Sequence, residues 1–392
     1  MQPQESTAIH YIQFHQAHIT DDEIKEVIDS LRSGWLTMGP KTVKFEEAFA
    51  NYVKSPYAVA VNSCTAAMHL ALKAIGLSAG DEVIVPALTF IATSEVVSYF
   101  NAQPVLVDVE RDTHNMDVAA VERAITGKTR AIIPVHYGGQ PCDLDELHEL
   151  GKRYNLHIIE DAAHALPSYY KGKIIGSLGD LTCFSFYATK TLTTGEGGMV
   201  CTANPEWAEA VKVLRLHGIT RDAWKRYAKG GSWFYEVVES GFKYNMTDVQ
   251  AGLGVAQLRK VDWMLARRAE IARTYTQAFC SREELLVPYI KPDRQTAWHL
   301  YPLKLNLETL KIDRNQFIEQ LIDYGIGIGV HFIPLYYHPY FQKNFDYHPR
   351  DFINSEWIYQ RVVSLPIYPD MTEADTSQVI NIIFDIIQKH KR

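Results

Sequence analysis

Short apolar runs alternate with stretches of helical periodicity from about residue 20 to residue 260. Residues 21–34, DDEIKEVIDSLRSG, place apolar side chains at helical spacing after an acidic start and end on Gly34, which predicts a helix. Residues 57–77 predict a short strand, a turn and a second helix. Further apolar runs predict buried strands in DEVIVPALTF, QPVLVDV, TRAIIPVH and LHIIEDAAHA. Buried strands separated by helices indicate an α/β layer with a mostly parallel sheet.

A second set of elements follows residue 260. Residues 251–279 predict one long helix or two joined helices. Beyond them the pattern predicts strands at 297–306 and 327–335. It also predicts helices at 313–325 and 374–390. We therefore expect two packed domains, a large α/β domain over residues 1–260 and a smaller C-terminal α+β domain over residues 261–392.

Composition excludes several classes of protein. The 392 residues carry a formal net charge of −7, whereas a nucleic-acid-binding protein gathers basic residues on one face. The five cysteines are scattered and form no C-x-x-C pair, so we expect no disulfide framework, no metal site and a reducing compartment. No signal peptide is evident, and the longest apolar runs are too short to cross a bilayer. These features predict a soluble, cytoplasmic protein without a membrane or nucleic-acid partner.

The turn NSCTAA, at 62–67, is the first candidate for chemistry. It joins a strand to a helix and points backbone N–H groups and the hydroxyls of Ser63 and Thr65 at the helix N-terminus, which suits a phosphate. Taken alone, the more ordinary interpretation is that Thr65 caps the helix.

The stretch HIIEDAAHA holds a second candidate. Asp161 ends a buried strand, where a carboxylate needs a cation or several hydrogen-bond donors. An equally good interpretation of this stretch alone is that Glu160 and Asp161 cap a following helix. His164 either orients a ligand or is a hydrogen-bonded core histidine, and the core interpretation leads when it is taken alone.

The stretch FSFYATKTLTTGEGG, at 184–198, holds a single lysine. Lys190 follows an apolar and aromatic strand, and such surroundings destabilise an ammonium ion and favour a nucleophilic amine. The glycines after it allow tight turns beside a ligand, and Ser185 on the strand is a candidate phosphate donor. The alternative is that Lys190 is a solvated surface lysine, and its aromatic neighbours argue against that interpretation.

Together these three signals are typical of a pyridoxal-phosphate site. The buried aspartate follows the phosphate cradle by about a hundred residues and precedes the lysine by about thirty. In such a site the aspartate keeps the pyridine nitrogen protonated, and the lysine binds the aldehyde and then moves a proton.

The sequence resembles the nucleotide-sugar aminotransferases of the DegT type, a branch of the fold-type I pyridoxal-phosphate enzymes. The resemblance covers nearly the whole chain and rests on ten ordered motifs: SGWLTMGPK, VNSCTAAMHLAL, DEVIVPALTFIATSEVV, IIPVHYGGQPCDLDEL, IIEDAAHA, GSLGDLTCFSFYATKTLTTGEGGMV, LRLHGITRD, KYNMTDVQAGLG, GVHFIPL and SLPIYPDMT. It implies a fold-type I PLP-transferase, with a mostly parallel seven-stranded sheet in the large domain and a smaller C-terminal α+β domain.

The resemblance also implies roles for individual residues. Lys190 would bind pyridoxal 5'-phosphate (PLP) covalently, Asp161 would pair with its ring nitrogen and His164 would lie near its phenolic oxygen. The remaining cofactor contacts would be stacking by Phe90, phosphate binding by Cys64, Thr65 and Ser185, and a contact from the partner subunit by Asn245. A site completed in this way implies a homodimer.

Substrate contacts follow from the same resemblance. His331 would lie near the sugar-binding cleft, and Trp35 and Thr37 would contact the nucleotide-sugar. The basic and aromatic stretch at 219–240 is either a diphosphate clamp or a solvated loop, with its cations at Arg221, Lys225, Arg226 and Lys229.

Two positions depart from the family pattern. Cys64 stands where glycine is usual in S-G-T, which keeps the backbone donor but requires its side chain to fit beside the phosphate. Thr191 follows the lysine where asparagine is common.

The resemblance implies transfer of an amino group from glutamate to a 4-keto, or alternatively a 3-keto, sugar on a UDP or TDP carrier. HGITRDAW and GVHFIPL are most similar to enzymes that make 4-amino-sugars for surface polysaccharide or lipid A. Related dehydratases carry histidine in place of the lysine, so Lys190 argues against that activity. An enzyme of free amino acids would need an arginine clamp that the sequence does not identify, and a non-catalytic PLP-binding regulator is the third alternative.

Overall fold

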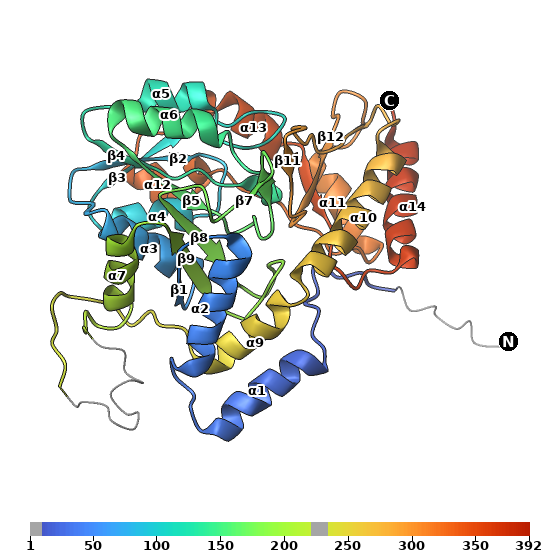
Figure 1. Ribbon diagram of the computed structural model, residues 1–392. Coiled ribbons are helices and arrows are strands. Elements are labelled where there is room, and N and C mark those ends of the chain that lie inside the picture. Colours follow the sequence, from blue (N-terminus) through green and yellow to red (C-terminus); the bar gives the residue numbers. More distant parts are fainter. Residues whose placement is uncertain (1–9, 221–233) are drawn as a thin grey trace.

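A seven-stranded sheet forms the centre of the molecule, as seen in a computed structural model that describes residues 10–220 and 234–392 (Figure 1). Along the sheet the strands are β1 (Tyr57–Val61), β9 (Gly198–Thr202), β8 (Leu181–Ser185), β5 (His157–Asp161), β4 (Thr129–Ile132), β2 (Glu82–Pro86) and β3 (Gln103–Val107). Only β9 is antiparallel to its neighbours, β1 and β8. The predicted mostly parallel sheet is confirmed.

Helices cover both faces of this sheet (Figure 1). Those that cover it are α2 (Pro40–Val53), α3 (Cys64–Ala74), α4 (Ala92–Ser98), α5 (Val118–Ala124), α6 (Leu144–Tyr154), α7 (Pro205–Leu214) and α9 (Asp248–Leu258), whereas α1 (Asp21–Ser33) packs against α9. Side chains alternate along each strand, so Ala58 and Ala60 of β1 pack in one buried cluster with α2 while Val59 and Val61 pack in another with α3. Burial on both faces explains why the strands are continuous apolar runs.

A second, smaller sheet has a core of its own. It consists of β10 (Leu285–Leu286), β12 (Tyr301–Leu305) and β13 (Val362–Leu365), and it packs with α10 (Val261–Phe279), α11 (Arg314–Asp323) and α14 (Glu373–His390). Figure 1 shows these helices beside the large sheet rather than on it. Ile12 belongs to this core as well, since its backbone bonds to Gly325 and Gly327.

The segment between α11 and β13 returns to the large sheet. It contains η2 (Leu335–Tyr337), α12 (Pro339–Asn344), η3 (Pro349–Asp351) and α13 (Ile353–Tyr359). Leu335, Phe341 and Phe352 are buried in the same cluster as α3 and α4. A short third sheet, of β6 (Tyr169–Tyr170), β7 (Lys173–Ile174) and β11 (Arg294–Gln295), joins the two regions, with η1 (Tyr137–Gly139) nearby. The domain boundary at residue 260 stays a prediction.

The helix predictions hold at most positions. α1 ends where Gly34 adopts φ 72° and its N–H bonds to the carbonyl of Leu31, as the sequence predicts. The stretch 251–279 is two helices, α9 and α10. The predicted strand at 327–335 is wrong, because only a single bridge forms, between Gly329 and Ser364. Pro334 lacks an N–H for a ladder, and the residues before it line a cavity instead.

Candidate active site

A cavity of about 640 Å³ lies beyond the carboxyl ends of β5 and β8 and at the N-terminus of α3. Its lining contains most of the predicted site residues: Cys64, Thr65, Phe90, Asp161, His164, Ser185, Lys190 and His331. The ends of parallel strands are where α/β sheets bind ligands, so the fold explains this gathering. Segment 330–332 and His299, from the C-terminal region, close the other side.

Lys190 lies in a turn directly after β8. Its backbone N–H donates to the carbonyl of Tyr187 at 2.9 Å, and its side chain faces the cavity. Burial lowers the pKa of Lys190 to about 8, although the negative charge of Asp161 offsets part of that effect. The amine therefore has a sizeable unprotonated fraction near neutral pH, which a nucleophile for carbonyl carbon needs.

Asp161 ends β5 and also faces the cavity. Its Oδ2 accepts a hydrogen bond from the hydroxyl of Thr93 at 2.8 Å, and its Oδ1 accepts from the N–H of Ala163 at 3.1 Å. Thr93 lies 2.9 Å from the hydroxyl of Thr89, so the two threonines form a chain that ends on the carboxylate. Burial raises the pKa of Asp161, and these donors oppose the rise by stabilising the charged form.

The alternative in which Glu160 and Asp161 cap a helix is wrong, since residues 162–165 form turns. Glu160 points to the opposite face of β5, where it accepts from His136 Nε2 at 2.7 Å and from Thr182 Oγ1 at 3.1 Å. Strand alternation therefore gives the two neighbouring acids different surroundings.

The N-terminus of α3 forms the floor of the cavity. Ser63, rather than Thr65, caps the helix, because its hydroxyl accepts from the N–H of Ala66 at 3.1 Å. Among the described residues, the N–H groups of Cys64 and Thr65 have no acceptor. The thiol of Cys64 turns to the carbonyl of Cys183, at 3.5 Å, so the cysteine fits without blocking those donors.

Gly198 lets β9 pass directly against this turn. A Cβ atom at Gly198 would lie 2.5 Å from the carbonyl carbon of Ser63 and 2.8 Å from the nitrogen of Cys64. Any other residue would therefore displace the two donors. Ser185, at the end of β8, lines the same part of the cavity. Free N–H groups at a helix N-terminus, a neighbouring hydroxyl, a carboxylate and an amine are the groups that pyridoxal phosphate requires, so the lining fits the cofactor.

Two predicted histidines contact the cavity as neutral rings. His164 Nδ1 accepts from the N–H of Gly138 at 3.3 Å, and burial holds the pKa of His164 well below its usual value. His331 Nδ1 lies 2.9 Å from the hydroxyl of Ser364, and burial together with Lys190 lowers the pKa of His331 to about 4. The ring of His331 stacks on Phe14, with centroids 5.6 Å apart.

The aromatic side chain of Phe90 lies at the cavity rim and is 60% exposed. Its ring centroid is 6.2 Å from that of Phe332. The stacking role that the resemblance implies for Phe90 stays a prediction.

Sequence reasoning missed several lining residues, among them Phe14, His299 and Phe332, and it missed Thr93 behind Asp161. Thr93 had a detectable signal, because Thr89 and Thr93 are spaced by one helical turn in an otherwise apolar segment. Phe14 and His299 had none, since they come from distant segments, whereas Phe332 stands directly after the predicted His331 in GVHFIPL.

Some predicted contacts do not line the cavity of this single chain. Asn245 lies beside Val61, with its amide oxygen 2.6 Å from Lys243 Nζ. Trp35 donates to the carbonyl of Met38 at 3.1 Å, and Thr37 is exposed next to it. Their roles stay predictions, and the basic residues predicted for the diphosphate, Arg221, Lys225, Arg226 and Lys229, lie outside the described residues.

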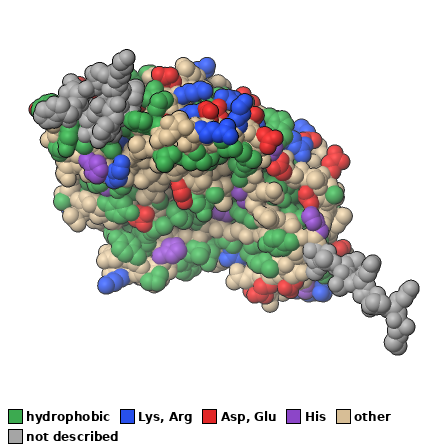
Figure 2. All heavy atoms as spheres, turned by 90° about the horizontal axis from the view of Figure 1, so that it is seen from below, with side chains coloured by type: hydrophobic (Ala, Val, Ile, Leu, Met, Phe, Trp, Pro, Cys, Tyr) green, Lys and Arg blue, Asp and Glu red, His purple; other side chains and the backbone are tan. Residues whose placement is uncertain are grey.

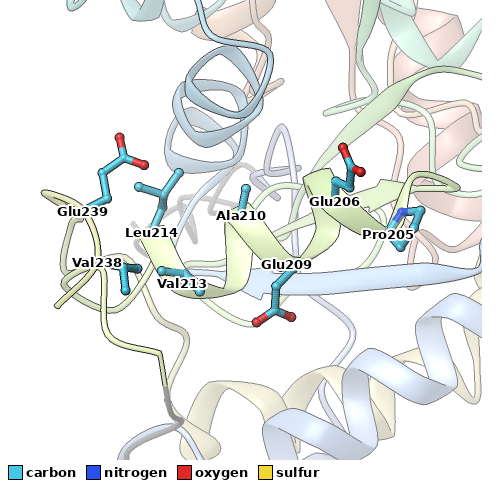
Figure 3. A pocket seen from close by; sticks show the side chains of 8 residues that line it. All are labelled: Pro205, Glu206, Glu209, Ala210, Val213, Leu214, Val238 and Glu239. Carbon is cyan, nitrogen blue, oxygen red and sulfur yellow. The ribbon is translucent and has the colours of Figure 1, made fainter. Parts of the chain in front are cut away.

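A second pocket, of about 510 Å³, has different chemistry (Figure 3). It lies along α7 and is lined by apolar residues with three carboxylates, Glu206, Glu209 and Glu239, and by neither lysine nor histidine. Within residues 10–220 and 234–392 there is no group of side chains suited to a metal ion, and no helix is long and apolar enough to span a membrane. The cavity at Lys190 is therefore the candidate active site.

Comparison with known proteins agrees with this assignment. Residues 17–384 match the DegT/DnrJ/EryC1/StrS aminotransferase family. The uncharacterized protein MJ1066 of Methanocaldococcus jannaschii is 54% identical over 373 residues, 95% of this chain and 97% of its own. The spore coat polysaccharide biosynthesis protein SpsC of Bacillus subtilis is 47% identical over 380 residues, 97% of this chain and 98% of its own.

A solved structure gives the same result. Spr1654 of Streptococcus pneumoniae, assigned as a sugar aminotransferase, superposes in its PMP-form with a TM-score of 0.90 at 35% identity, covering 96% of this chain and 99% of its own. Its PLP-form superposes with a TM-score of 0.89. The predicted fold class and aminotransferase activity are confirmed, and the predicted cofactor is confirmed at the level of the family. By sequence and by fold, the chain belongs to the DegT/DnrJ/EryC1/StrS aminotransferase family.

Proposed function

We propose that the chain is a pyridoxal-phosphate-dependent sugar aminotransferase that moves an amino group from glutamate to a nucleotide-linked keto-sugar. The observation that carries the proposal is the cavity that joins the Lys190 amine, the Asp161 carboxylate and the free N–H groups of Cys64 and Thr65. The similarity to SpsC, a polysaccharide biosynthesis protein, supports a sugar acceptor. A 4-keto sugar on UDP or TDP, destined for surface polysaccharide or lipid A, is the acceptor we propose.

Three parts of the cavity would hold the cofactor. The N–H groups of Cys64 and Thr65, with the hydroxyl of Ser185, would bind its phosphate. Asp161 would bind the ring nitrogen, and Lys190 would bind the aldehyde carbon. When bound, pyridoxal phosphate supplies an electron sink for the substrate carbon.

The chain's own residues would then handle the protons. Lys190, with a pKa near 8, is suited to take a proton from the substrate carbon and return it, because its acid and base forms are both populated near neutral pH. Asp161 must stay ionised to hold a proton on the ring nitrogen, and the hydrogen bonds from Thr93 and Ala163 favour that state.

We also propose that two copies of the chain form a homodimer. α1 exposes Ile24, Ile28 and Leu31 at helical spacing, with exposed fractions of 50%, 39% and 54%. On the face seen from below, which includes α1, Figure 2 shows hydrophobic side chains interspersed with charged ones. A second copy covering such a surface would bury apolar area and bring Asn245 toward the site of its partner. The cytoplasmic location stays a prediction.

A visible absorption spectrum of the protein with pyridoxal phosphate, recorded before and after adding glutamate, tests the proposal. We expect glutamate to remove the band of the lysine-bound cofactor and to produce the band of the pyridoxamine form. A keto-sugar nucleotide that restores the first band identifies the acceptor and decides between a 3-keto and a 4-keto sugar. A stable band that glutamate leaves unchanged would favour an enzyme of another amino acid or a regulator, and absence of any band would contradict the assignment of Lys190.

A further inference from the structure

His299 lines the cavity, and its side chain has no hydrogen-bond partner in the part of the chain that the structure describes. It is 7% exposed, and its Nδ1 is buried with no partner among the described residues. Its ring centroid lies 4.3 Å from that of His164. Because buried polar groups in folded proteins are nearly always bonded, a histidine left unpaired at a cavity points to a ligand.

The backbone around His299 is held firmly. Trp298 adopts φ 48°, a left-handed conformation that is costly for a bulky side chain. The N–H of His299 donates to the carbonyl of Gly138 at 3.0 Å, and Arg268 Nη1 donates to the carbonyl of Trp298 at 3.3 Å. Such strain persists only where surrounding contacts enforce it, and here they fix the backbone that carries the His299 side chain.

The ring is neutral, and Nε2 is its nitrogen that is not fully buried at the cavity. Burial, with the charges of Lys190 and Arg268 nearby, holds the pKa of His299 well below its usual value. A neutral ring carries one proton, and a buried N–H without an acceptor costs more than a buried lone pair, so the proton belongs on Nε2 rather than on the buried Nδ1. His164 also carries its proton on Nε2, because its Nδ1 accepts from Gly138.

The amino donor brings a carboxylate that this cavity must bind. No arginine occurs among the cavity residues that the structure describes, although arginine is the usual partner of a carboxylate. We infer that His299 is a binding residue for the carboxylate of the amino donor, which it contacts through Nε2–H beside His164. This inference rests on the proposed function, and it assigns to the active site a position for the carboxylate of the amino donor.

Two small reagents that differ by one carboxylate test the inference. Aminooxyacetate and methoxyamine both react with an aldehyde and so bleach the visible band of the bound cofactor, but only aminooxyacetate carries a carboxylate. We compare the ratio of the two rate constants among the wild type, His299→Leu and His299→Gln. A variant that binds as much cofactor as the wild type is taken as folded. The readout is a spectral change and requires no turnover.

We expect His299→Leu to lower the ratio of aminooxyacetate to methoxyamine about ten- to a hundredfold, because a hydrogen bond to a charged group is lost. His299→Gln keeps an N–H donor and should therefore retain much of the wild-type ratio. An unchanged ratio in His299→Leu overturns the inference. If that variant does not fold, an unchanged ratio in His299→Ala, which also lacks the N–H donor, does the same. A wild-type protein without a band that methoxyamine bleaches contradicts the proposed function instead.

Discussion

Two lysines, Lys190 and Lys304, have similarly lowered pKa values and different surroundings. Burial lowers the pKa of each to about 8. Lys304 Nζ lies 3.1 Å from His114 Nε2 and 3.3 Å from the carbonyl of Arg111, and the residue is only 4% exposed. Lys190 instead opens into a cavity of about 640 Å³ that also holds a carboxylate. A lowered pKa therefore does not distinguish a reactive lysine from a structural one, whereas access and a second charged group do.

Replacement of Lys190 should have the largest effect. We expect Lys190→Ala to lose the visible cofactor band and to lower turnover at least about 10⁴-fold, because both the covalent attachment and the proton carrier are removed. Turnover is measured with the acceptor identified as above. Lys304→Met is the matched control and should keep both band and activity; normal turnover in Lys190→Ala would exclude its catalytic role.

Removal of the Asp161 charge should come next. Asp161→Ala leaves the ring nitrogen without an anionic partner, and we expect the rate of the glutamate half-reaction to fall about a hundredfold or more. Stopped-flow absorbance measures this rate. Unchanged kinetics would mean that another carboxylate serves the cofactor.

A smaller effect should follow from Thr93→Val, which removes the donor to Asp161 Oδ2. The pKa of Asp161 is already raised by burial, and without this donor it should rise further, so activity is lost at a higher pH as the carboxylate becomes protonated. The acidic limb of the pH–rate profile should therefore move upward, with a rate about tenfold lower at neutral pH. Thr93→Ser should restore both the position of the acidic limb and the rate at neutral pH. An acidic limb that does not move in Thr93→Val would refute the role of the hydroxyl.

Lys304→Met should change stability rather than activity. The folded pKa of Lys304 is lowered from 10.5 to about 8, so between those values the unfolded chain binds more protons and the stability of the fold rises with pH. We expect the apoprotein to gain thermal stability over this range and Lys304→Met to gain less. The midpoint of thermal unfolding at pH 8 and pH 10 measures the difference, and equal gains would show that the fold does not lower the pKa of Lys304.

The sequence predicts the parts of this molecule that local patterns encode. Continuous apolar runs predict the parallel sheet, and the strand-end positions of Asp161 and Lys190 predict that the two meet. Local patterns do not encode contacts between distant segments, and for that reason His299 and Phe14 were missed. The strand predicted at 327–335 failed for a related reason. Side chains of that segment line the cavity, and its backbone forms only a single bridge, between Gly329 and Ser364.

The helix caps show a finer limit. Ser63 and Thr65 are both good N-cap residues, and the sequence alone favoured Thr65. The position of Ser63 against Gly198 of β9 decides the matter, since the close approach of that strand fixes where the turn ends and the helix begins. Hydrogen bonds between elements, such as that from Thr93 to Asp161, need the assembled fold as well.

The most direct test is to locate the cofactor on the chain. Borohydride reduction of the protein loaded with pyridoxal phosphate makes the bond between the lysine amine and the cofactor permanent, and mass spectrometry of the peptides then identifies the modified residue. We predict modification of Lys190 alone, with Lys304 unmodified despite its similar pKa. Stoichiometric modification of Lys304 or another lysine, with Lys190 free, would contradict the assignment of the active site.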